Sequence, residues 1–429
     1  MENGCNIIKD MRVLWLSNCQ LTKKSPTSTG SWLYSMANAL TDNGVELYNI
    51  TTGNGAKTEF FSDEKIKEWV MPGCKLSKDF LPPQSVISEI QSIITEVNPQ
   101  IIHIWGLEGF WSRLSWKGYI TGPVLLEMQG LMSSCAEVFY GGLSLKEKIA
   151  CYRLKELISY KRSLPYERRL FTIKGEQEPA ILHHHKYIST QSDWVRSRIM
   201  PLISNDCHVY NTDIAVRKCF AESNRWRVTD CDKKTLLSVA SGATPYKGLH
   251  VAIKALKIVK ERYNDVEFRI VGDYSQNSAS WRKSGYVKYL EKLINKLGLK
   301  KNVVFLGPLT AEEIVEELHK TNVFIQSSFV ESYSLTVAEA LTVGVPSVIS
   351  YAGAMPELAK DGETGLFYNP TDYFKCAYQI MKILNDDKLS EILSLSAINY
   401  SRTRHSLGRV FDIQINIYND FLTDYYKNE

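Results

Sequence analysis

The stretch NVVFLGPLTAEEIVEELHKTNVFIQSS, residues 302–328, contains the alternation that decides the fold. Its two short apolar runs, residues 302–307 and 322–328, are typical of buried strands. Residues 311–320 between them have the pattern of an amphipathic helix. This stretch therefore predicts a strand–helix–strand unit of a parallel α/β sheet.

The same alternation extends outward in both directions along the chain. In the second half, strands are predicted at 235–241, 266–273 and 346–350, and helices at 248–263, 286–299 and 335–344. In the first half, strands are predicted at 11–18, 45–52, 68–72, 101–106 and 122–130, and a helix at 31–44. The simplest architecture is two doubly wound parallel-sheet domains, each Rossmann-like, that face each other across a cleft.

The domain boundaries follow from where this alternation stops. A chain of 429 residues is long for one core and suggests two domains. The first is assigned to residues 1–211 and the second to residues 235–404. Residues 212–234 are polar with little periodicity, which is typical of a connection between domains. A C-terminal helix at 405–429 has an apolar stripe that could cover the first domain.

Composition excludes several classes of protein. A formal net charge of +4 over 429 residues is weak evidence for a nucleic-acid partner. The nine cysteines form no C-x-x-C pair, and their scatter indicates free thiols in a reducing cytosol. No window approaches the roughly 20 apolar residues that span a bilayer. We expect a cytoplasmic protein whose only membrane contact would be peripheral, on the inner face.

Three loops share one design, in which a strand leads into the start of a helix: residues 25–33, 244–250 and 331–339. In doubly wound sheets, ligands bind at the carboxyl ends of strands beside such turns. Free backbone N–H groups at a helix start suit phosphate, and Lys247 adds a positive charge. The alternative is that Gly30 and Gly248 only shape turns and that Lys247 is a solvated surface residue. The repetition of the design in both halves favours a ligand site.

The order of motifs in the second half resembles a known family. The segments LLSVAS, TPYKGLH, VEFRIVGD, ESYSLTVAEALTVGVPSVIS and GAMPELAKDGETGLFYNP, within residues 235–372, resemble the nucleotide-sugar half of family 4 retaining glycosyltransferases, which have the GT-B fold. The first half resembles the family more weakly, through residues 11–44 and the segments IIHIWG and LLEMQGL. The resemblance implies transfer of a sugar from a nucleotide diphosphate sugar to a glycan or lipid-linked acceptor, in the synthesis of cell-surface polysaccharide or glycoconjugate.

The resemblance also implies roles for a pair of glutamates eight residues apart. Glu331 matches the family position at the donor sugar, and Glu339 matches the position that binds the ribose of the nucleotide. Lys247 matches the phosphate lysine. The predicted catalytic residues are therefore Glu331 and Lys247, where the lysine stabilises the diphosphate as the glycosidic bond breaks.

Further donor-binding residues are expected in both halves. The backbone N–H groups of Ser334, Leu335 and Thr336 begin a helix and could reach the phosphates. Gly30 and Gln129 are expected to line the facing wall, and Gln129 stands where several family members have a histidine.

The sequence departs from the family pattern at the phosphate site. Gly242 stands where the family usually has an arginine, so Lys247 acts alone or another cation substitutes. No paired-aspartate motif stands at a strand end, which favours a metal-free reaction with no cofactor besides a UDP- or GDP-sugar co-substrate. His103 and Glu108 lie near another strand end, where a buried structural histidine and an acceptor contact are both open.

Two questions stay open on the sequence alone. Residues 146–174 carry nine Lys or Arg against three Glu, interleaved with Leu, Ile and Tyr, so they could be a solvated helical face or contact an anionic membrane. The whole chain could instead be a nucleotide-sugar epimerase of the same fold, or a catalytically dead partner that binds sugar nucleotides.

Overall fold

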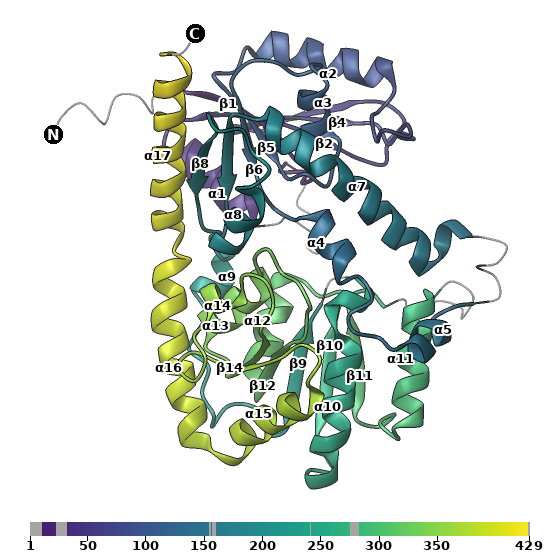
Figure 1. Cartoon of the computed structure of the whole chain (residues 1–429). Coiled ribbons are helices and arrows are strands. Elements are labelled where there is room, and N and C mark those ends of the chain that lie inside the picture. Colours follow the sequence, from purple (N-terminus) through teal and green to yellow (C-terminus); the bar gives the residue numbers. More distant parts are fainter. Residues whose placement is uncertain are drawn as a thin grey trace. The chain divides into compact units, whose positions relative to one another are not determined.

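A computed structural model describes the chain at residues 11–22, 32–153, 156, 160–240, 242–274 and 283–427. It divides into two compact units (Figure 1). Unit 1 consists of residues 1–132, 176–215 and 405–429, and unit 2 consists of residues 133–175 and 216–404. Each unit contains one mainly parallel sheet with helices on its faces, so the prediction of two doubly wound α/β domains is confirmed.

The sheet of unit 1 has eight strands in the order β3-β4-β2-β1-β5-β6-β7-β8. The strands are β1 (Arg12–Leu16), β2 (Glu46–Thr52), β3 (Glu59–Ser62), β4 (Ile66–Met71), β5 (Ile101–Trp105), β6 (Val124–Glu127), β7 (Tyr187–Thr190) and β8 (His208–Asn211). All neighbours are parallel except the edge strand β3, which pairs antiparallel with β4 and was not predicted. The order reverses beside β1, which is the arrangement of a doubly wound sheet.

Helices cover both faces of this sheet. They are α1 (Leu33–Asp42), α2 (Gln84–Val97), α3 (Trp111–Trp116), α8 (Asp193–Ile199) and α17 (Leu407–Tyr425), while α4 (Met132–Glu137) and α7 (Leu164–His184) contain the unit boundaries. Alternate residues of β1 enter different cores, because successive side chains of a strand point to opposite faces. Leu14 packs with α2, and Trp15 packs with α1 and α17. This explains why the strand is apolar throughout rather than alternating.

The C-terminal helix α17 is held to unit 1 by a buried hydrogen-bond chain. The indole Nε1 of Trp15 donates to the Tyr418 hydroxyl at 3.1 Å, and that hydroxyl lies 2.8 Å from Nδ1 of His103. The tautomer of the imidazole decides whether Nδ1 or the hydroxyl donates in this second contact. Nε2 lies 3.7 Å from a buried carboxylate oxygen of Glu127.

The sheet of unit 2 has six strands, all parallel, in the order β11-β10-β9-β12-β13-β14. The strands are β9 (Thr235–Val239), β10 (Glu267–Val271), β11 (Val303–Gly307), β12 (Val323–Gln326), β13 (Ser347–Ser350) and β14 (Leu366–Tyr368). The helices are α5 (Leu145–Ala150), α9 (Lys218–Ala221), α10 (Leu249–Arg262), α11 (Gly285–Lys296), α12 (Ala311–Lys320), α13 (Leu335–Val343), α14 (Met355–Leu358), α15 (Tyr373–Asn385) and α16 (Asp387–Arg404), with 3-10 turns η1 (Tyr160–Arg162) and η2 (Pro245–Lys247).

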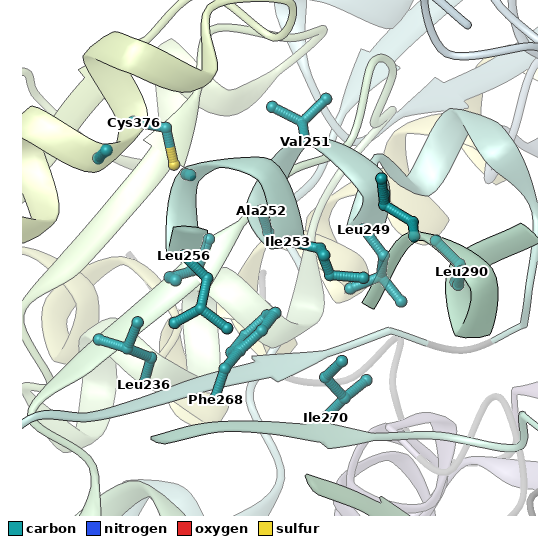
Figure 2. Packing of buried hydrophobic residues seen from close by; sticks show 14 of the residues in the cluster. Leu236, Leu249, Val251, Ala252, Ile253, Leu256, Phe268, Ile270, Leu290 and Cys376 are labelled. Carbon is teal, nitrogen blue, oxygen red and sulfur yellow. The ribbon is translucent and has the colours of Figure 1, made fainter. Parts of the chain in front are cut away.

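Local sequence explains the strand–helix–strand unit from which the fold was predicted. Helix α12 begins at a capping box, in which the Thr310 hydroxyl accepts from the Glu313 N–H and the Glu313 carboxylate accepts from the Thr310 N–H. The apolar stripe of α10 packs on the sheet, where Leu256 approaches Leu236 of β9 and Phe268 of β10 (Figure 2). These contacts form the main core of unit 2.

The structure assigns residues 133–175 to unit 2, whereas the sequence analysis included them in the first domain. The anchor is Glu147, whose Oε1 accepts from Lys254 at 2.7 Å and from Tyr289 at 2.8 Å. Burial raises the pKa of Glu147, but these bonds and those from Ser144 outweigh it and hold the pKa at about 2. A prediction that assigns each domain to one continuous range of residues cannot detect that the chain enters unit 2 at residue 133 and returns to unit 1 at residue 176.

The structure also corrects the interpretation of residues 212–234 as a linker. From residue 216 onward this segment belongs to unit 2, and Phe220 and Trp226 are fully buried there. The Trp226 indole donates to the carbonyl of Thr321 at 2.7 Å. The linker prediction rested on the polar composition of this segment, but its two buried aromatic side chains anchor the segment in the core of unit 2.

Candidate donor site in unit 2

A pocket of about 160 Å³ lies at the carboxyl ends of β9 and β12 in unit 2. Its lining residues are Val239, Ala240, Lys247, Gln326, Glu331, Tyr333, Ser334, Leu335 and Thr336. Five of the residues predicted to bind or activate a donor are therefore brought to one place. Strand ends of a doubly wound sheet are the position where such folds bind ligands.

Glu331 is the centre of the hydrogen bonds in this pocket. Its Oε1 accepts from Lys247 Nζ at 2.8 Å, from Ser328 Oγ at 2.7 Å and from Gln326 Nε2 at 3.1 Å. Within the described part of the chain, no donor contacts the other oxygen, Oε2. The carboxylate is thus fixed in orientation while one oxygen remains available to a ligand.

Lys247 keeps its positive charge in the pocket although its side chain is only one-fifth exposed. Burial alone would lower the pKa of Lys247, but the adjacent Glu331 carboxylate raises it above the ordinary lysine value. A cation held beside a helix start is suited to an anionic ligand.

The first turn of α13 faces the same pocket. Ser334 is the N-cap residue, yet its hydroxyl makes no capping bond and instead accepts from Gln326 Nε2 at 3.2 Å. The N–H groups of Leu335 and Thr336 begin the helix and have no intrahelical acceptor. This helix start can therefore donate to an anion.

Two glycines allow the backbone segments around the pocket to approach closely. A Cβ added to Gly248, whose φ is +72°, would lie 1.8 Å from the carbonyl oxygen of Ser327. A Cβ on Gly353, whose φ is +56°, would lie 2.1 Å from the carbonyl oxygen of Glu331. Gly353 was not identified as a site residue from the sequence, although GAMPEL was among the family segments.

Glu339 does not line this pocket. It lies one turn further along α13, where its side chain is 2% exposed and Arg217 contacts both of its oxygens. Arg217 was not predicted, because it lies in the segment interpreted as a linker. The buried Phe220 three residues later is the signal that could have identified it.

The remaining predicted residues lie outside this pocket. Gly30 is outside the described residues. Gln129 is half-buried in unit 1 just after β6, and its Oε1 would lie 3.2 Å from a Cβ on Gly106 at the end of β5. Gly242 has a φ of +84°, and no atom of the described residues beyond its chain neighbours lies within 4 Å of where its Cβ would be.

His103 is in the middle of β5 and fully buried, which favours a structural role over an acceptor contact. Burial lowers its pKa, and its ring stacks on Trp105 with centroids 4.1 Å apart. Glu108 instead lies beside Gly106 and Gly130, where its carboxylate would clash with an added Cβ.

Neither a metal-binding cluster nor a membrane-spanning helix is found in the part of the chain that the structure describes. No group of three or more His, Cys, Asp or Glu among the described side chains could hold a metal ion. No helix in the described ranges is both long and apolar enough to cross a bilayer. Metal independence stays a prediction.

Comparison with known proteins finds glycosyltransferase similarity in the second half of the chain. Residues 221–400 match the family described as Glycosyl transferases group 1. D-inositol 3-phosphate glycosyltransferase of Corynebacterium diphtheriae is 28% identical over 156 residues, which is 36% of this chain and 36% of that protein. Sulfoquinovosyl transferase SQD2 of Arabidopsis thaliana is 28% identical over 153 residues, 35% of this chain and 27% of that protein. The chain thus matches about a third of the length of these curated relatives.

Solved structures are similar over nearly the whole chain. Sucrose-phosphate synthase from Thermosynechococcus elongatus has a TM-score of 0.73 at 14% identity and covers 96% of this chain and 100% of its own. The fold is GT-B. Anabaena HepE, solved in complex with UDP and glucose, has a TM-score of 0.67 at 14% identity with the same coverage. The predicted GT-B architecture is therefore confirmed.

The close approach of Gly248 to the Ser327 carbonyl predicts how alanine substitution will affect stability, and Gly298 provides a matched control. Gly298 has a similar φ of +69° but no atom within 4 Å of a Cβ, so Gly298→Ala carries only the strain of left-handed backbone. Gly248→Ala adds a clash with the Ser327 carbonyl, and we expect it to destabilise the protein by about 2 kcal/mol or more beyond the control. Urea unfolding of the two variants measures the difference. Equal destabilisation would show that the two loops are not in close contact.

Proposed function

We propose that this protein is a retaining glycosyltransferase that moves a sugar from a nucleotide diphosphate sugar to an acceptor. The observation that carries the proposal is the convergence of Lys247, the Glu331 carboxylate and the start of α13 on one pocket. The similarity of residues 221–400 to group 1 glycosyl transferases supports it. A UDP- or GDP-sugar is the proposed donor, and the UDP bound to Anabaena HepE supports this class.

The chemistry follows from the charge that appears when the glycosidic bond breaks. The bond between the anomeric carbon and the phosphate oxygen is cleaved, so negative charge develops on the diphosphate and positive charge on the sugar ring. Lys247 and the N–H groups of Ser334, Leu335 and Thr336 would stabilise the diphosphate. Glu331 would bind the sugar hydroxyls through Oε2 and orient the ring.

The acceptor is proposed to attack from the face that the leaving group vacates, within an ion pair. The departing phosphate takes the acceptor proton, and the new glycosidic bond retains the anomeric configuration. Attack within an ion pair requires no covalent glycosyl intermediate on Glu331, whose proposed role is to bind the sugar hydroxyls and orient the ring. We propose that the reaction requires no divalent metal.

An assay of nucleotide diphosphate release tests this proposal. With candidate UDP- and GDP-sugars, we expect release that depends on a glycan or lipid-linked acceptor and persists in chelator. The anomeric configuration of the product, measured by NMR, should match that of the donor. A new sugar nucleotide without release would indicate an epimerase, and binding without any turnover would indicate a dead partner protein. Activity lost in chelator and restored by Mg²⁺ or Mn²⁺ would contradict metal independence.

Lys247 should carry most of the phosphate stabilisation, because Gly242 replaces the expected arginine. We expect Lys247→Ala to lower turnover by about 100-fold or more. Lys257→Ala is the control, because Lys257 is an exposed lysine of the same unit that pairs with Glu261 on the surface of α10. Thermal melting checks that both variants fold. A loss of only a few-fold in Lys247→Ala would show that another cation holds the phosphates.

We also propose that residues 146–174 and the adjacent Leu145 contact the inner face of an anionic membrane that presents a lipid-linked acceptor. The exposed side chains there include Leu145 at 73% and Ile149 at 60%, with Lys146 and Lys161 also exposed. Exposed apolar side chains interleaved with lysine are suited to an anionic lipid surface.

Vesicle sedimentation tests the membrane contact. We expect binding to phosphatidylglycerol-containing vesicles but not to phosphatidylcholine vesicles, and loss of binding in Leu145→Glu with Ile149→Glu. The control is Ile392→Glu, a half-exposed isoleucine of α16. Equal binding by the variant and the wild-type protein would support a solvated face instead.

A further inference from the structure

Glu339 is a carboxylate in an unfavourable place for a charge. Its side chain is 2% exposed on α13, and burial raises its pKa. A buried ionised carboxylate needs a compensating partner, or it takes up a proton. Arg217 is the cation that opposes this effect and favours the charged form.

The contact between the two side chains is bidentate. Nε of Arg217 donates to Oε1 of Glu339 at 2.6 Å, and Nη2 donates to Oε2 at 2.9 Å. A planar guanidinium matched to a carboxylate in this way fixes the orientation of the carboxylate as well as its charge. A lysine could supply the charge but not this geometry.

Arg217 is itself held in place by the segment that carries it. It is the N-cap residue of α9, and its guanidinium lies 4.7 Å from the ring centre of the fully buried Phe220. Helix α9 packs against α12 and α13. The arginine is therefore presented to Glu339 by a packed element and not by a mobile surface side chain.

We propose that Arg217 is a positioning residue for the donor nucleotide. It keeps Glu339 ionised and oriented so that the carboxylate receives both hydroxyls of the ribose. A carboxylate has about four acceptor positions, and the guanidinium occupies two of them, so two remain for a vicinal diol. The inference rests on the proposed function, and it adds a residue from outside the family motifs.

Calorimetric titration with UDP and GDP, and with their 2′,3′-dideoxy counterparts, tests this role. We expect Arg217→Met to weaken binding of the ribonucleotide about tenfold. Binding of the dideoxy nucleotide, which has no diol to offer Glu339, should be unchanged. The control is Arg225→Met, which removes an arginine that pairs with Glu391 of α16 in the same unit. Thermal melting identifies variants that do not fold.

The pH dependence of nucleotide affinity separates a positioning role of Arg217 from a purely structural one. Loss of a purely structural ion pair would not change this pH dependence. Without Arg217, burial acts unopposed on Glu339, so its pKa rises and the carboxyl takes up a proton as the pH falls. The affinity of Arg217→Met relative to the wild-type protein should therefore decrease from about pH 8 to about pH 6, because a protonated carboxyl accepts fewer hydrogen bonds. Arg217→Lys should bind more weakly than the wild-type protein but keep its pH profile.

Two other groups face the pair, Cys219 of α9 and Glu312 of α12. Burial raises the pKa of the Cys219 thiol, so the thiol stays protonated as the pH falls from about 8 to about 6, and Glu339 is the carboxylate whose bonded cation is removed in Arg217→Met. Glu339 is therefore the group expected to respond in this range. The nucleotide phosphate also titrates, but its effect on affinity cancels when the variant is compared with the wild-type protein at the same pH.

The outcomes separate this proposal from the function on which it rests. If the wild-type protein binds neither nucleotide, the proposed function fails and the role of Arg217 fails with it. If the wild-type protein binds and Arg217→Met binds equally well, only the positioning role is overturned. Equal losses for ribo- and dideoxynucleotide would also overturn it, since Arg217 would then act on the phosphates or on the fold. Tighter binding by Arg217→Met would show that the arginine competes with the ribose.

Discussion

The pocket at the start of α13 depends on one partly buried ionic contact, between Lys247 and Oε1 of Glu331 at 2.8 Å. Each side chain needs the other, because a lone charge in this partly buried position would be costly. Gln326 and Ser328 add donors to the same oxygen, so the carboxylate cannot turn freely. The loop that contains Lys247 approaches the loop that contains Glu331 closely at Gly248, where a side chain would clash with the neighbouring backbone. Contacts among the protein's own side chains therefore organise the pocket, and such organisation is the condition for electrostatic stabilisation of a transition state.

A second ion pair, between Arg217 and Glu339, lies further along the chain at α13. Glu331 precedes α13 and Glu339 lies within it, and each is paired with a cation from another loop or helix of unit 2. In the proposed function, the first pair binds sugar and diphosphate and the second binds the ribose. Both carboxylates would then accept hydroxyl groups while their partners preserve their charge. The two pairs differ in that Lys247 lines the pocket and Arg217 does not.

The fold, and the meeting of the loops at 244–250 and 331–339 at one edge of the sheet, could be predicted because they follow from local pattern and from sheet topology. The roles of Lys247 and Glu331 were predicted from the family resemblance, and their contact was not predicted. Strands such as β11 and β12 were visible as apolar runs, and the carboxyl ends of parallel strands must share one edge of the sheet. Arg217 could not be predicted in this way, because it lies in a polar stretch with no periodicity. Only its neighbours Phe220 and Trp226 indicate that the stretch is packed. The placement of residues 133–175 in unit 2 depends on long-range contacts of Glu147, which no local pattern encodes.

The proposed function requires unit 2 to bind a nucleotide diphosphate at the start of α13. Hydrogen–deuterium exchange with and without UDP or GDP tests this most directly, because it locates the bound ligand without requiring knowledge of the acceptor. Bound nucleotide is expected to slow exchange at residues 334–336 and in the loop at 244–250. Unchanged exchange there at saturating nucleotide, or protection confined to other segments, would contradict it.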